Sequence, residues 1–287
     1  MIRIALPNKG RLADAAREVL DAAGLPLGVR GERALQAPLG TEFLALFARA
    51  RDIPEFVADG AADVGVTGRD LVEECGRPLE TLLDLGFGRC RLAVAASDES
   101  GIAAVCDVPE RARVATSFPQ LTSRYFRRHG REVEVVPVSG AAEIAPHLGV
   151  ADVIVDLVSS GSTLKMNGMH EVATVLESTA LLVARPEVLE DAGAAAKLRE
   201  LAAALESVVR AADRRYLMAN VPRAELAAVK RILPGVSGPT IVELLDGGEH
   251  VAAHAVVSQS EVYRAIAELK AIGATGILVT RIERLMP

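Results

Sequence analysis

Short aliphatic runs that alternate with helix-forming stretches are the feature that most constrains how this chain can fold. Each run of Val, Ile, Leu and Ala leads into a turn that contains Gly, Asp or Asn. Such alternation predicts helices packed on mainly parallel sheets, an α/β fold. The predicted strands lie at 2–6, 42–47, 63–66, 91–96, 113–116, 132–138, 152–156 and 178–184. The predicted helices lie at 13–23, 53–60, 119–129, 141–148 and 186–212.

The composition agrees with this fold class. Hydrophobic residues make up 50% of the 287 residues, whereas aromatic residues make up 3% and Trp is absent. The cores must therefore be filled by aliphatic side chains, which suits the continuous apolar strands of parallel sheets. The length allows one to three domains.

The pattern changes after residue 212, where we place the start of a separate domain at 213–287. Its β-α-β-β-α-β order is typical of a ferredoxin-like domain. A turn at Asp246-Gly247-Gly248 joins its two middle strands, and Ser258 and Glu261 have the spacing of a capping box. The strands are predicted at 216–221, 239–245, 250–257 and 277–282, and the helices at 222–233 and 258–273.

Charge, cysteine and histidine content argue against several classes of function. The net charge of −6 disfavours general nucleic-acid binding, and no apolar stretch has the length of a membrane helix or a signal peptide. We therefore expect a cytoplasmic protein. Cys75, Cys90 and Cys106 are widely spaced, so we expect reduced thiols in the core rather than zinc ligands or disulfides. His250 and His254 fall on one predicted strand, where they share a face without converging on a metal.

Residues 60–66 and 149–155 form a short internal repeat. Each copy has a Gly that ends a helix, a two-residue link, an Asp and a strand, and a loop with Thr and Gly follows. The repeat predicts two similar lobes whose strand-end loops face each other across a cleft. Chance similarity is the alternative, and the prediction fails if the two loops lie far apart.

The loop after the strand at 152–156 has the composition of a phosphate-binding loop. Ligands of α/β sheets bind at the carboxyl ends of strands, and Gly161 allows backbone N–H donors to approach an anion closely. The hydroxyls of Ser159, Ser162 and Thr163 could add donors, and Asp156 is placed to accept hydrogen bonds from sugar hydroxyls. An ordinary polar turn is the alternative.

Cationic residues follow two of the first predicted strands. Lys9 and Arg11 precede a helix, a position suited to an anionic group, and Arg49 and Arg51 follow the next strand. Solvated charges on exposed loops are the alternative at both places. Asp70 either contacts a ligand or caps the helix that follows it. Together with the loop described above, these residues indicate a multiply phosphorylated substrate held between two lobes.

Five stretches together resemble the long form of ATP phosphoribosyltransferase, the first enzyme of histidine biosynthesis. They follow the order of that family over the whole chain. The stretches are "IALPNKGRL" (4–12), "RARDIPEFVADGAADVGVTGRDL" (49–71), "LDLGFGRCRL" (83–92), "GAAEIAPHLGVADVIVDLVSSGSTL" (140–164) and "YLMANVPR" (216–223).

The resemblance implies a two-lobed catalytic unit similar to type II periplasmic binding proteins, followed by a regulatory domain that binds histidine. Lobe I would comprise 1–90 with 180–212, lobe II 91–179, and the regulatory domain 213–287. The substrates would be ATP and phosphoribosyl pyrophosphate (PRPP), with Mg²⁺ as cofactor, and dimers would be in equilibrium with hexamers.

The same resemblance implies roles for individual residues. Adenine N1 of ATP would attack C1 of the PRPP ribose, with Asp156 holding the ribose hydroxyls and residues 159–163 cradling the 5-phosphate. One departure is that a single acid precedes the loop, where phosphoribosyltransferases of the commoner fold carry two adjacent acids. The implied set is catalytic Lys9, Arg11, Arg49 and Arg51; substrate-binding Asp156, Ser159, Ser160, Gly161, Ser162, Thr163, Asp70 and Glu143; and allosteric Asn220, Ser237, Thr240 and Gly276.

Alternatives stay open for several of these residues. Glu143 also suits an exposed helix surface, and plain turn chemistry explains the allosteric set nearly as well. At the level of function, the competing hypotheses are a ligand-binding module without catalysis and a histidine-sensing scaffold. The clustered cations and the phosphate-type loop favour the enzyme over both.

Overall fold

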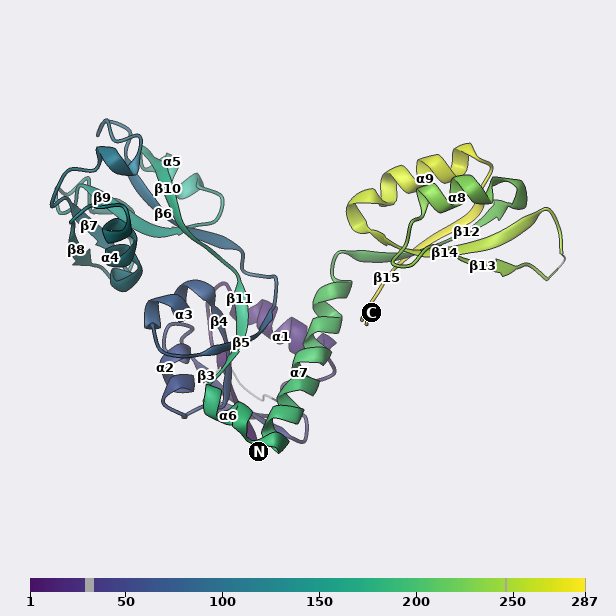
Figure 1. Ribbon diagram of the computed structural model, residues 1–287, viewed down its shortest axis with the longest axis horizontal. Coiled ribbons are helices and arrows are strands. Elements are labelled where there is room, and N and C mark those ends of the chain that lie inside the picture. The colour runs from purple at the N-terminus through teal and green to yellow at the C-terminus, as the bar shows by residue number, and fades with distance from the viewer. Residues whose placement is uncertain (29–33, 246, 287) are drawn as a thin grey trace. The chain divides into compact units, whose positions relative to one another are not determined.

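The computed structural model describes residues 1–28, 34–245 and 247–286, and the chain divides into two compact units (Figure 1). The units are Met1–Ala202 and Ala203–Pro287. The first unit holds two sheets, whose subdomains we call lobe I and lobe II, and the second holds one. Asp246, predicted to lie in a turn, falls outside the described residues.

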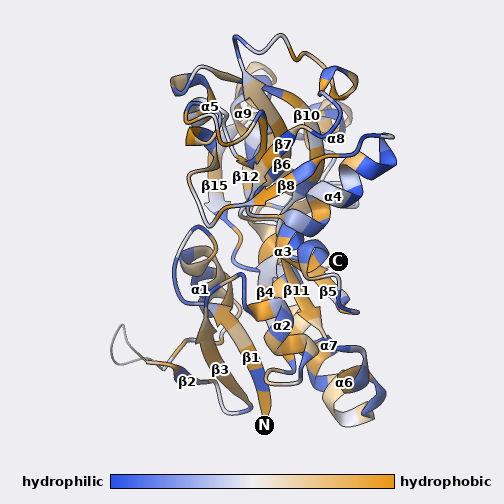
Figure 2. Cartoon of the chain, turned by 90° about the vertical axis from the view of Figure 1, so that its left-hand side faces the viewer, coloured by the Kyte–Doolittle hydropathy of each residue, from blue (hydrophilic) through white to orange (hydrophobic). Residues whose placement is uncertain are grey.

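Lobe I is a six-stranded sheet with the order β2-β3-β1-β4-β11-β5. Its strands β1, β3 and β4 are parallel, and β11 runs antiparallel beside β4. In Figure 2, β1, β4 and β11 are coloured mostly hydrophobic, as expected for strands inside a sheet. The strands are β1 (Ile2–Pro7), β2 (Gln36–Leu39), β3 (Phe43–Ala48), β4 (Val64–Gly68), β5 (Glu80–Asp84) and β11 (Ala180–Ala184), and the helices are α1 (Ala13–Ala22), α2 (Ile53–Ala58) and α3 (Arg69–Cys75).

Lobe II is a five-stranded sheet with the order β10-β6-β9-β7-β8. Its strands β8, β7 and β9 are parallel, and β6 runs antiparallel beside β9. A parallel core with an antiparallel strand beside its last strand thus occurs in both lobes, and lobe I has a further antiparallel strand, β2, at its other edge. The strands are β6 (Cys90–Ser97), β7 (Arg113–Thr116), β8 (Glu134–Pro137), β9 (Val153–Val158) and β10 (Met169–Ser178), and the helices are α4 (Pro119–Arg128) and α5 (Ser162–Met166).

The internal sequence repeat marks the same anchor in both lobes. In lobe I, Asp63 accepts a hydrogen bond from the backbone N–H of Arg3 (2.9 Å), whose guanidinium donates to the Gly60 carbonyl (2.8 Å). In lobe II, Asp152 accepts from the backbone N–H of Arg113 (2.8 Å), whose guanidinium donates to the Gly149 carbonyl (3.0 Å). Each repeat therefore fastens the start of one strand to the start of its parallel neighbour.

The chain crosses between the lobes twice. It leaves lobe I after β5 and enters lobe II at β6, and it returns from β10 to β11 through Thr179. Ser178, the last residue of β10, is paired with Cys90, the first residue of β6. The two crossovers therefore lie side by side and form the connection between the lobes.

The second unit is a four-stranded antiparallel sheet with the order β13-β14-β12-β15. Two helices cover one face of it (Figure 1), and they bury Leu217, Val229 and Leu269 at its centre. The predicted β-α-β-β-α-β order is confirmed. The elements are β12 (Arg214–Pro222), α8 (Leu226–Ile232), β13 (Thr240–Glu243), β14 (His250–Ser258), α9 (Val262–Ala271) and β15 (Thr275–Arg281).

Several local predictions are wrong. The helix predicted at 141–148 is reduced to a 3₁₀ turn at Ala142–Ile144, whose N-cap residue, Ala141, is left-handed (φ 50°). The single helix predicted at 186–212 is divided into α6 (Pro186–Glu190) and α7 (Ala192–Ala211), because Asp191 adopts an extended backbone. Strands β2, β5 and β10 were not predicted, since their residues are mostly part-exposed and lack a continuous apolar run.

Two side-chain predictions also need correction. The Ser258 hydroxyl lies 2.9 Å from the Ser260 hydroxyl and makes no capping bond, so the predicted capping box does not form. The three cysteines are free, but they do not all lie in the core: Cys90 is buried, Cys75 is half-buried and Cys106 is exposed.

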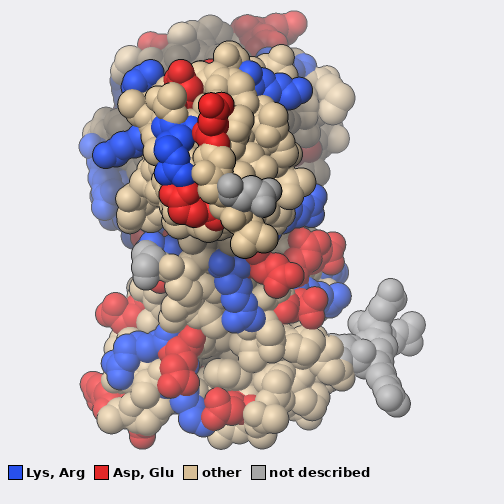
Figure 3. Space-filling view, turned by 90° about the vertical axis from the view of Figure 1, so that its right-hand side faces the viewer, with Lys and Arg blue, Asp and Glu red and all other residues tan. Residues whose placement is uncertain are grey.

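The charge and hydropathy of the surface fit the composition. On the face shown in Figure 3, Lys and Arg are interspersed with Asp and Glu, so the net charge is not gathered into one broad field there. Within the described part of the chain, no helix is both long enough and apolar enough to cross a membrane. His250 and His254 lie on β14 as predicted, and His254 Nδ1 is 3.0 Å from the Tyr216 hydroxyl.

Candidate active site between the two lobes

A pocket of about 260 Å³ opens between the two lobes at the carboxyl ends of their strands. We call it the inter-lobe pocket. Lobe I contributes cationic residues and Asp70, and lobe II contributes the ends of β7 and β9. Its lining residues are Lys9, Gly10, Arg11, Leu12, Ala50, Arg51, Asp70 and Leu71 from lobe I, and Ser117, Phe118, Asp156 and Leu157 from lobe II.

A second pocket of about 160 Å³ lies within lobe II, around the loop that joins β9 to α5. We call it the loop pocket. Asp156 and Leu157 line both pockets, so the two are neighbours on either side of these residues. The strand-end loops of the two lobes therefore meet at one site, which confirms the prediction made from the internal repeat. The loop pocket is lined by Glu143, Ile154, Asp156, Leu157, Val158, Ser159, Ser160, Gly161, Thr163 and Leu164.

The loop between β9 and α5 exposes polar groups to its pocket. Gly161 precedes α5 with a left-handed backbone (φ 78°), which a residue with a side chain rarely adopts. The Ser160 and Ser162 hydroxyls lie 2.9 Å apart, and the Ser162 N–H donates to the Ser160 hydroxyl (3.3 Å). Ser159 and Thr163 are exposed. Ser162 is outside the pocket lining, so Ser160 and Thr163 are the better placed hydroxyls.

Asp156 occupies the boundary between the two pockets and is half-buried. Burial raises its pKa, and the nearby carboxylate of Glu143 acts in the same direction. A hydrogen bond from the Leu157 N–H (2.7 Å) and the positive charge of Arg51 oppose the rise, but the pKa remains above its ordinary value. Asp156 is thus a carboxylate that gains from a ligand able to donate hydrogen bonds or bring positive charge.

The cations of lobe I come from two loops. Lys9 and Arg11 follow β1, and the Arg11 guanidinium donates to the Gly88 carbonyl and lies 3.4 Å from Asp70 Oδ1. Arg51 follows β3 and reaches across to lobe II, where it donates to the Ser117 carbonyl (2.8 Å) and lies over the Phe118 ring (5.8 Å).

Arg49 lies in the same loop as Arg51 but has a different position. It is exposed and lies outside the lining of both pockets. The loop itself is fastened by the Thr67 hydroxyl, which donates to the Ala50 carbonyl (2.8 Å). The structure therefore brings Lys9, Arg11 and Arg51 together and leaves Arg49 at the edge of the group.

Asp70 is buried, with 1% of its surface exposed, and does not cap α3 with its side chain. The N-cap position belongs to Gly68, so the simple capping alternative is wrong. Asp70 instead accepts a hydrogen bond from the Ser178 hydroxyl, and its own N–H donates back to Ser178 Oγ (3.1 Å). A Cβ on Gly68 would lie 2.2 Å from Asp70 Oδ1, so only glycine fits beside this carboxylate.

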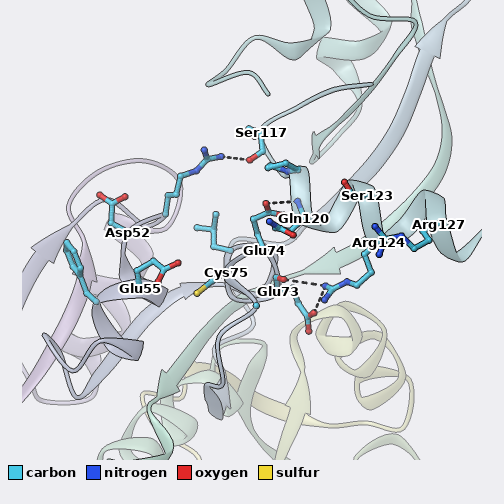
Figure 4. Close-up of a pocket in the computed structure, with 15 residues that line it drawn as sticks. Asp52, Glu55, Glu73, Glu74, Cys75, Ser117, Gln120, Ser123, Arg124 and Arg127 are labelled. Atoms are coloured by element: carbon cyan, nitrogen blue, oxygen red, sulfur yellow. Dashed lines mark hydrogen bonds and ion pairs between the residues drawn. The ribbon is translucent and has the colours of Figure 1, made fainter. Parts of the chain in front are cut away.

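A set of contacts that no sequence motif indicates joins α3 of lobe I to α4 of lobe II. Both carboxylate oxygens of Glu74 accept hydrogen bonds from the first turn of α4, from Gln120 N–H and Leu121 N–H (2.9 Å each). Glu73 forms an ion pair with Arg124 (2.9 Å). Figure 4 shows the contact of Glu74 with Gln120 and that of Glu73 with Arg124 on the wall of a groove of about 1000 Å³, beside the inter-lobe pocket.

Within the described residues, no group of three His, Cys, Asp or Glu side chains could hold a metal ion. Asp156 and Glu143 are the two acidic residues that line the loop pocket. Mg²⁺ is commonly bound by one or two carboxylates together with substrate phosphates and water. The site therefore fits a divalent ion that arrives with a phosphorylated substrate.

In the second unit, the structure brings together two of the four predicted allosteric residues. Asn220 lies in the middle of the sheet on β12, and a Cβ on Gly276 would lie 3.3 Å from its Nδ2. Thr240 begins the edge strand β13 and is paired with His254, so β14 separates it from Asn220. Ser237 is exposed in the turn before β13.

Two lobes with parallel cores, two crossover connections and a ligand pocket at the strand ends define the class as a two-lobed fold of the type II periplasmic-binding-protein kind. A ferredoxin-like domain follows it. The family model of ATP phosphoribosyltransferase (HisG) matches residues 49–207, and the model of the HisG C-terminal domain matches residues 211–284. The chain belongs to the ATP phosphoribosyltransferase family, and its activity is that of this enzyme of histidine biosynthesis.

Individual relatives agree over the full length. The chain is 58% identical to the ATP phosphoribosyltransferase of Gemmatimonas aurantiaca and 46% identical to that of Methanosarcina barkeri, with 100% of both chains covered in each case. Among solved structures, it resembles an ATP phosphoribosyl transferase (HisG:HisZ) complex from Thermotoga maritima, with a TM-score of 0.65 and 26% identity. That match covers 73% of this chain and 99% of the other. The reaction of this family needs a divalent metal ion.

Proposed function

We propose that the loop pocket binds the 5-phosphate and ribose of PRPP, while the inter-lobe pocket holds its pyrophosphate and the ATP adenine. The observation that carries this division is that Asp156 lines both pockets. A ribose beside Asp156 would have its phosphate in one pocket and its C1 substituent in the other. This arrangement puts the reacting carbon at the boundary between the lobes.

The phosphate subsite would use the backbone N–H groups around Gly161 and the hydroxyls of Ser160 and Thr163. Successive N–H groups in a turn form a concave anion site, and glycine permits close approach. Ser159 would add its N–H or hydroxyl, and Ser162 would act through its hydroxyl contact with Ser160 (2.9 Å). The Arg91 guanidinium, which donates to the Ser159 carbonyl (3.3 Å), would hold the loop from behind.

The ribose subsite would use Asp156 as hydrogen-bond acceptor, with Glu143 on the pocket wall as a second carboxylate. Both carboxylates lie where positive charge develops on the sugar as the bond to pyrophosphate breaks. A fixed negative charge beside such an oxocarbenium-like centre stabilises the transition state. The raised pKa of Asp156 agrees with a carboxylate that is incompletely compensated before substrate binds.

The leaving pyrophosphate would be stabilised by Lys9, Arg11 and Arg51, with Arg49 joining from the edge of the pocket. Adenine N1 is already nucleophilic, so the step demands positioning and charge stabilisation rather than a strong general base. Asp70 would contact the ATP nucleotide in the same pocket. Mg²⁺ that arrives with the pyrophosphate would supply further positive charge to the leaving group, and Asp156 and Asp70 are the acidic residues that line this pocket.

The test of the phosphate and ribose subsites uses Asp156→Ala and Thr163→Ala, with Thr174→Ala as control. Thr174 is an exposed threonine of lobe II that lines neither pocket. We expect both site variants to lose most PRPP binding and pyrophosphate release, with circular dichroism unchanged, whereas the control behaves as the parent. Normal turnover in either site variant would refute the assignment.

The second unit would bind histidine and inhibit the enzyme. The observation that supports this proposal is the close approach of Asn220 and Gly276 near the middle of the sheet. Thr240 and Ser237 lie toward the edge of the same sheet. Removal of 213–287 should relieve inhibition by histidine, and Asn220→Ala should raise the concentration needed for half inhibition. Inhibition that survives both changes would place the effector elsewhere.

Dimers in equilibrium with hexamers would accompany this regulation. We expect histidine to shift the equilibrium toward the larger species, because an effector favours whichever state binds it more tightly. Sedimentation velocity with and without histidine measures this directly. A distribution that histidine leaves unchanged would contradict the coupling.

A further inference from the structure

We propose that Ser178 is a positioning residue: through its hydrogen bond to Asp70, it orients the Arg11 guanidinium. This inference rests on the proposed function, in which Arg11 stabilises the leaving pyrophosphate. Ser178 lies outside the lining of both pockets and would touch no substrate. Its influence on the reaction would be carried by the hydrogen-bonded contacts that lead from Ser178 to Arg11.

The first contact is a closed pair between Ser178 and Asp70. The Ser178 hydroxyl donates to Asp70 Oδ1, and the Asp70 N–H donates to the same hydroxyl oxygen (3.1 Å). Both residues are buried, with 2% and 1% of their surface exposed. Hydrogen bonds to a buried charged group are among the stronger ones in proteins, so this pair fixes the carboxylate firmly.

The second contact is the ion pair between Asp70 and Arg11. The Arg11 guanidinium lies 3.4 Å from Asp70 Oδ1, the same oxygen that Ser178 bonds. Among the described residues, nothing donates a hydrogen bond to the buried Asp70 Oδ2. The orientation of the carboxylate therefore depends on what holds Oδ1, and this oxygen holds the Arg11 guanidinium together with the Gly88 carbonyl.

Ser178 lies at the connection between the lobes, so these contacts join the crossover to the substrate pocket as well as packing neighbouring side chains. Ser178 ends β10 in lobe II and is paired with Cys90 at the other crossover, whereas Asp70 and Arg11 belong to lobe I. The same three-residue chain thus links the connection between the lobes to a cation in the substrate pocket. A shift at the crossover would change where Arg11 points.

The experiment is a double-mutant cycle on pyrophosphate binding to the full chain, measured by calorimetry with inorganic pyrophosphate and Mg²⁺. Ser178→Thr and Ser178→Val have the same shape and differ in the hydroxyl, so steric strain is common to both. We expect the Val variant to bind pyrophosphate about tenfold more weakly than the Thr variant, since a hydrogen bond to a charged group is lost. Ser207→Ala is the control, because Ser207 is equally buried but bonds the Ala204 carbonyl of its own helix.

Repeating the Thr/Val comparison in an Arg11→Ala background separates positioning from general stability. If Ser178 acts through Arg11, the tenfold difference should shrink to less than about twofold there, because the group being positioned is gone. An undiminished difference, or none in the parent background, would overturn the inference. If Arg11→Ala alone leaves pyrophosphate binding unchanged, the role proposed for Arg11 fails instead, and the two failures are distinguishable.

Discussion

The anchors that fasten the parallel strands differ between the two lobes in how deeply they are buried. In lobe I, the Asp63 side chain is 12% exposed and also pairs with Arg185 (3.4 Å), whereas in lobe II the Asp152 side chain is 44% exposed. Burial acts to raise the pKa of Asp63, but the hydrogen bonds from Arg3 outweigh it and the pKa is lowered. The same sequence repeat thus makes a tightly held anchor in lobe I and a looser one in lobe II.

The ends of the same strands differ in chemistry. Lobe I presents Lys9, Arg11 and Arg51 to the inter-lobe pocket, and lobe II presents Asp156 and the hydroxyl-rich loop after it. One architecture therefore supplies a cationic wall on one side, and a carboxylate with a neutral loop rich in hydroxyl groups on the other. The shared repeat specifies how the strands are fastened, whereas the loops beyond the strands specify which chemical groups each lobe presents to the pockets.

The largest expected effect comes from removing a cation of lobe I. Lys9→Ala should lower kcat/KM by about 10²–10³-fold, as loss of one donor to developing negative charge commonly does. Lys9 is exposed, so its removal should leave thermal stability near that of the parent. Arg49→Ala, in a residue outside both pocket linings, should cost less. Equal losses of kcat/KM in the two variants would contradict the distinction between Lys9, which lines the pocket, and Arg49, which lies outside its lining.

The next effect concerns the anchors themselves. Asp63→Ala should lower the free energy of unfolding by about 3 kcal/mol. The backbone N–H of Arg3 and the guanidinium of Arg185 would lose the buried carboxylate that accepts their hydrogen bonds. Asp152→Ala should cost about 1 kcal/mol or less, because its ion pair with Arg113 is exposed. Urea unfolding measures both.

The pH dependence of the Asp63 anchor has a defined sign. Since folding lowers the pKa of Asp63, its stabilising contribution is present above the unfolded value of about 3.9 and is lost as pH falls through the folded value. The difference in stability between the parent and Asp63→Ala should therefore narrow as pH falls below about 4. A stability difference between the two proteins that does not change with pH would contradict an ion-paired Asp63.

A third prediction contrasts Asp156, which lies within β9, with Asp152, which directly precedes the strand. The pKa of Asp156 is raised by burial, so its stabilising contribution exists below the unfolded pKa and is lost as pH rises through the folded value. Asp156→Asn should therefore raise Tm at neutral pH while it weakens PRPP binding. Asp152→Asn, just before the strand, should lower Tm because it removes the ion pair with Arg113. Differential scanning calorimetry measures whether Tm rises in the Asp156 variant and falls in the Asp152 variant.

The smallest expected effect concerns the contact between α3 and α4. Glu74→Ala should cost about 1 kcal/mol, as loss of a helix cap commonly does, because two N–H groups of α4 lose their acceptor. The neighbouring Glu73→Ala removes an exposed ion pair with Arg124 and should cost less. If Glu73 proves the more costly of the two, the capping contact is not what holds α3 to lobe II.

Local sequence patterns are enough to predict the order of the main strands, the ferredoxin-like unit and the position of the two anchor aspartates. These features depend on local patterns: aliphatic runs, Gly at helix ends, and Asp at a fixed spacing before a strand. The sequence also pointed to the loop after β9 and to Lys9, Arg11 and Arg51, because ligand groups gather at the carboxyl ends of parallel strands.

Only the tertiary structure decided which groups meet. Ser178 reaches Asp70 and Glu74 caps α4 across 108 and 46 residues of sequence, and no local pattern encodes such distant hydrogen bonds. The same holds for the exclusion of Arg49 from the pocket lining, which depends on how the loop after β3 is fastened by Thr67. The physical reason is that hydrophobic periodicity specifies elements and their buried faces, whereas the partners of a polar side chain are set by how those elements pack.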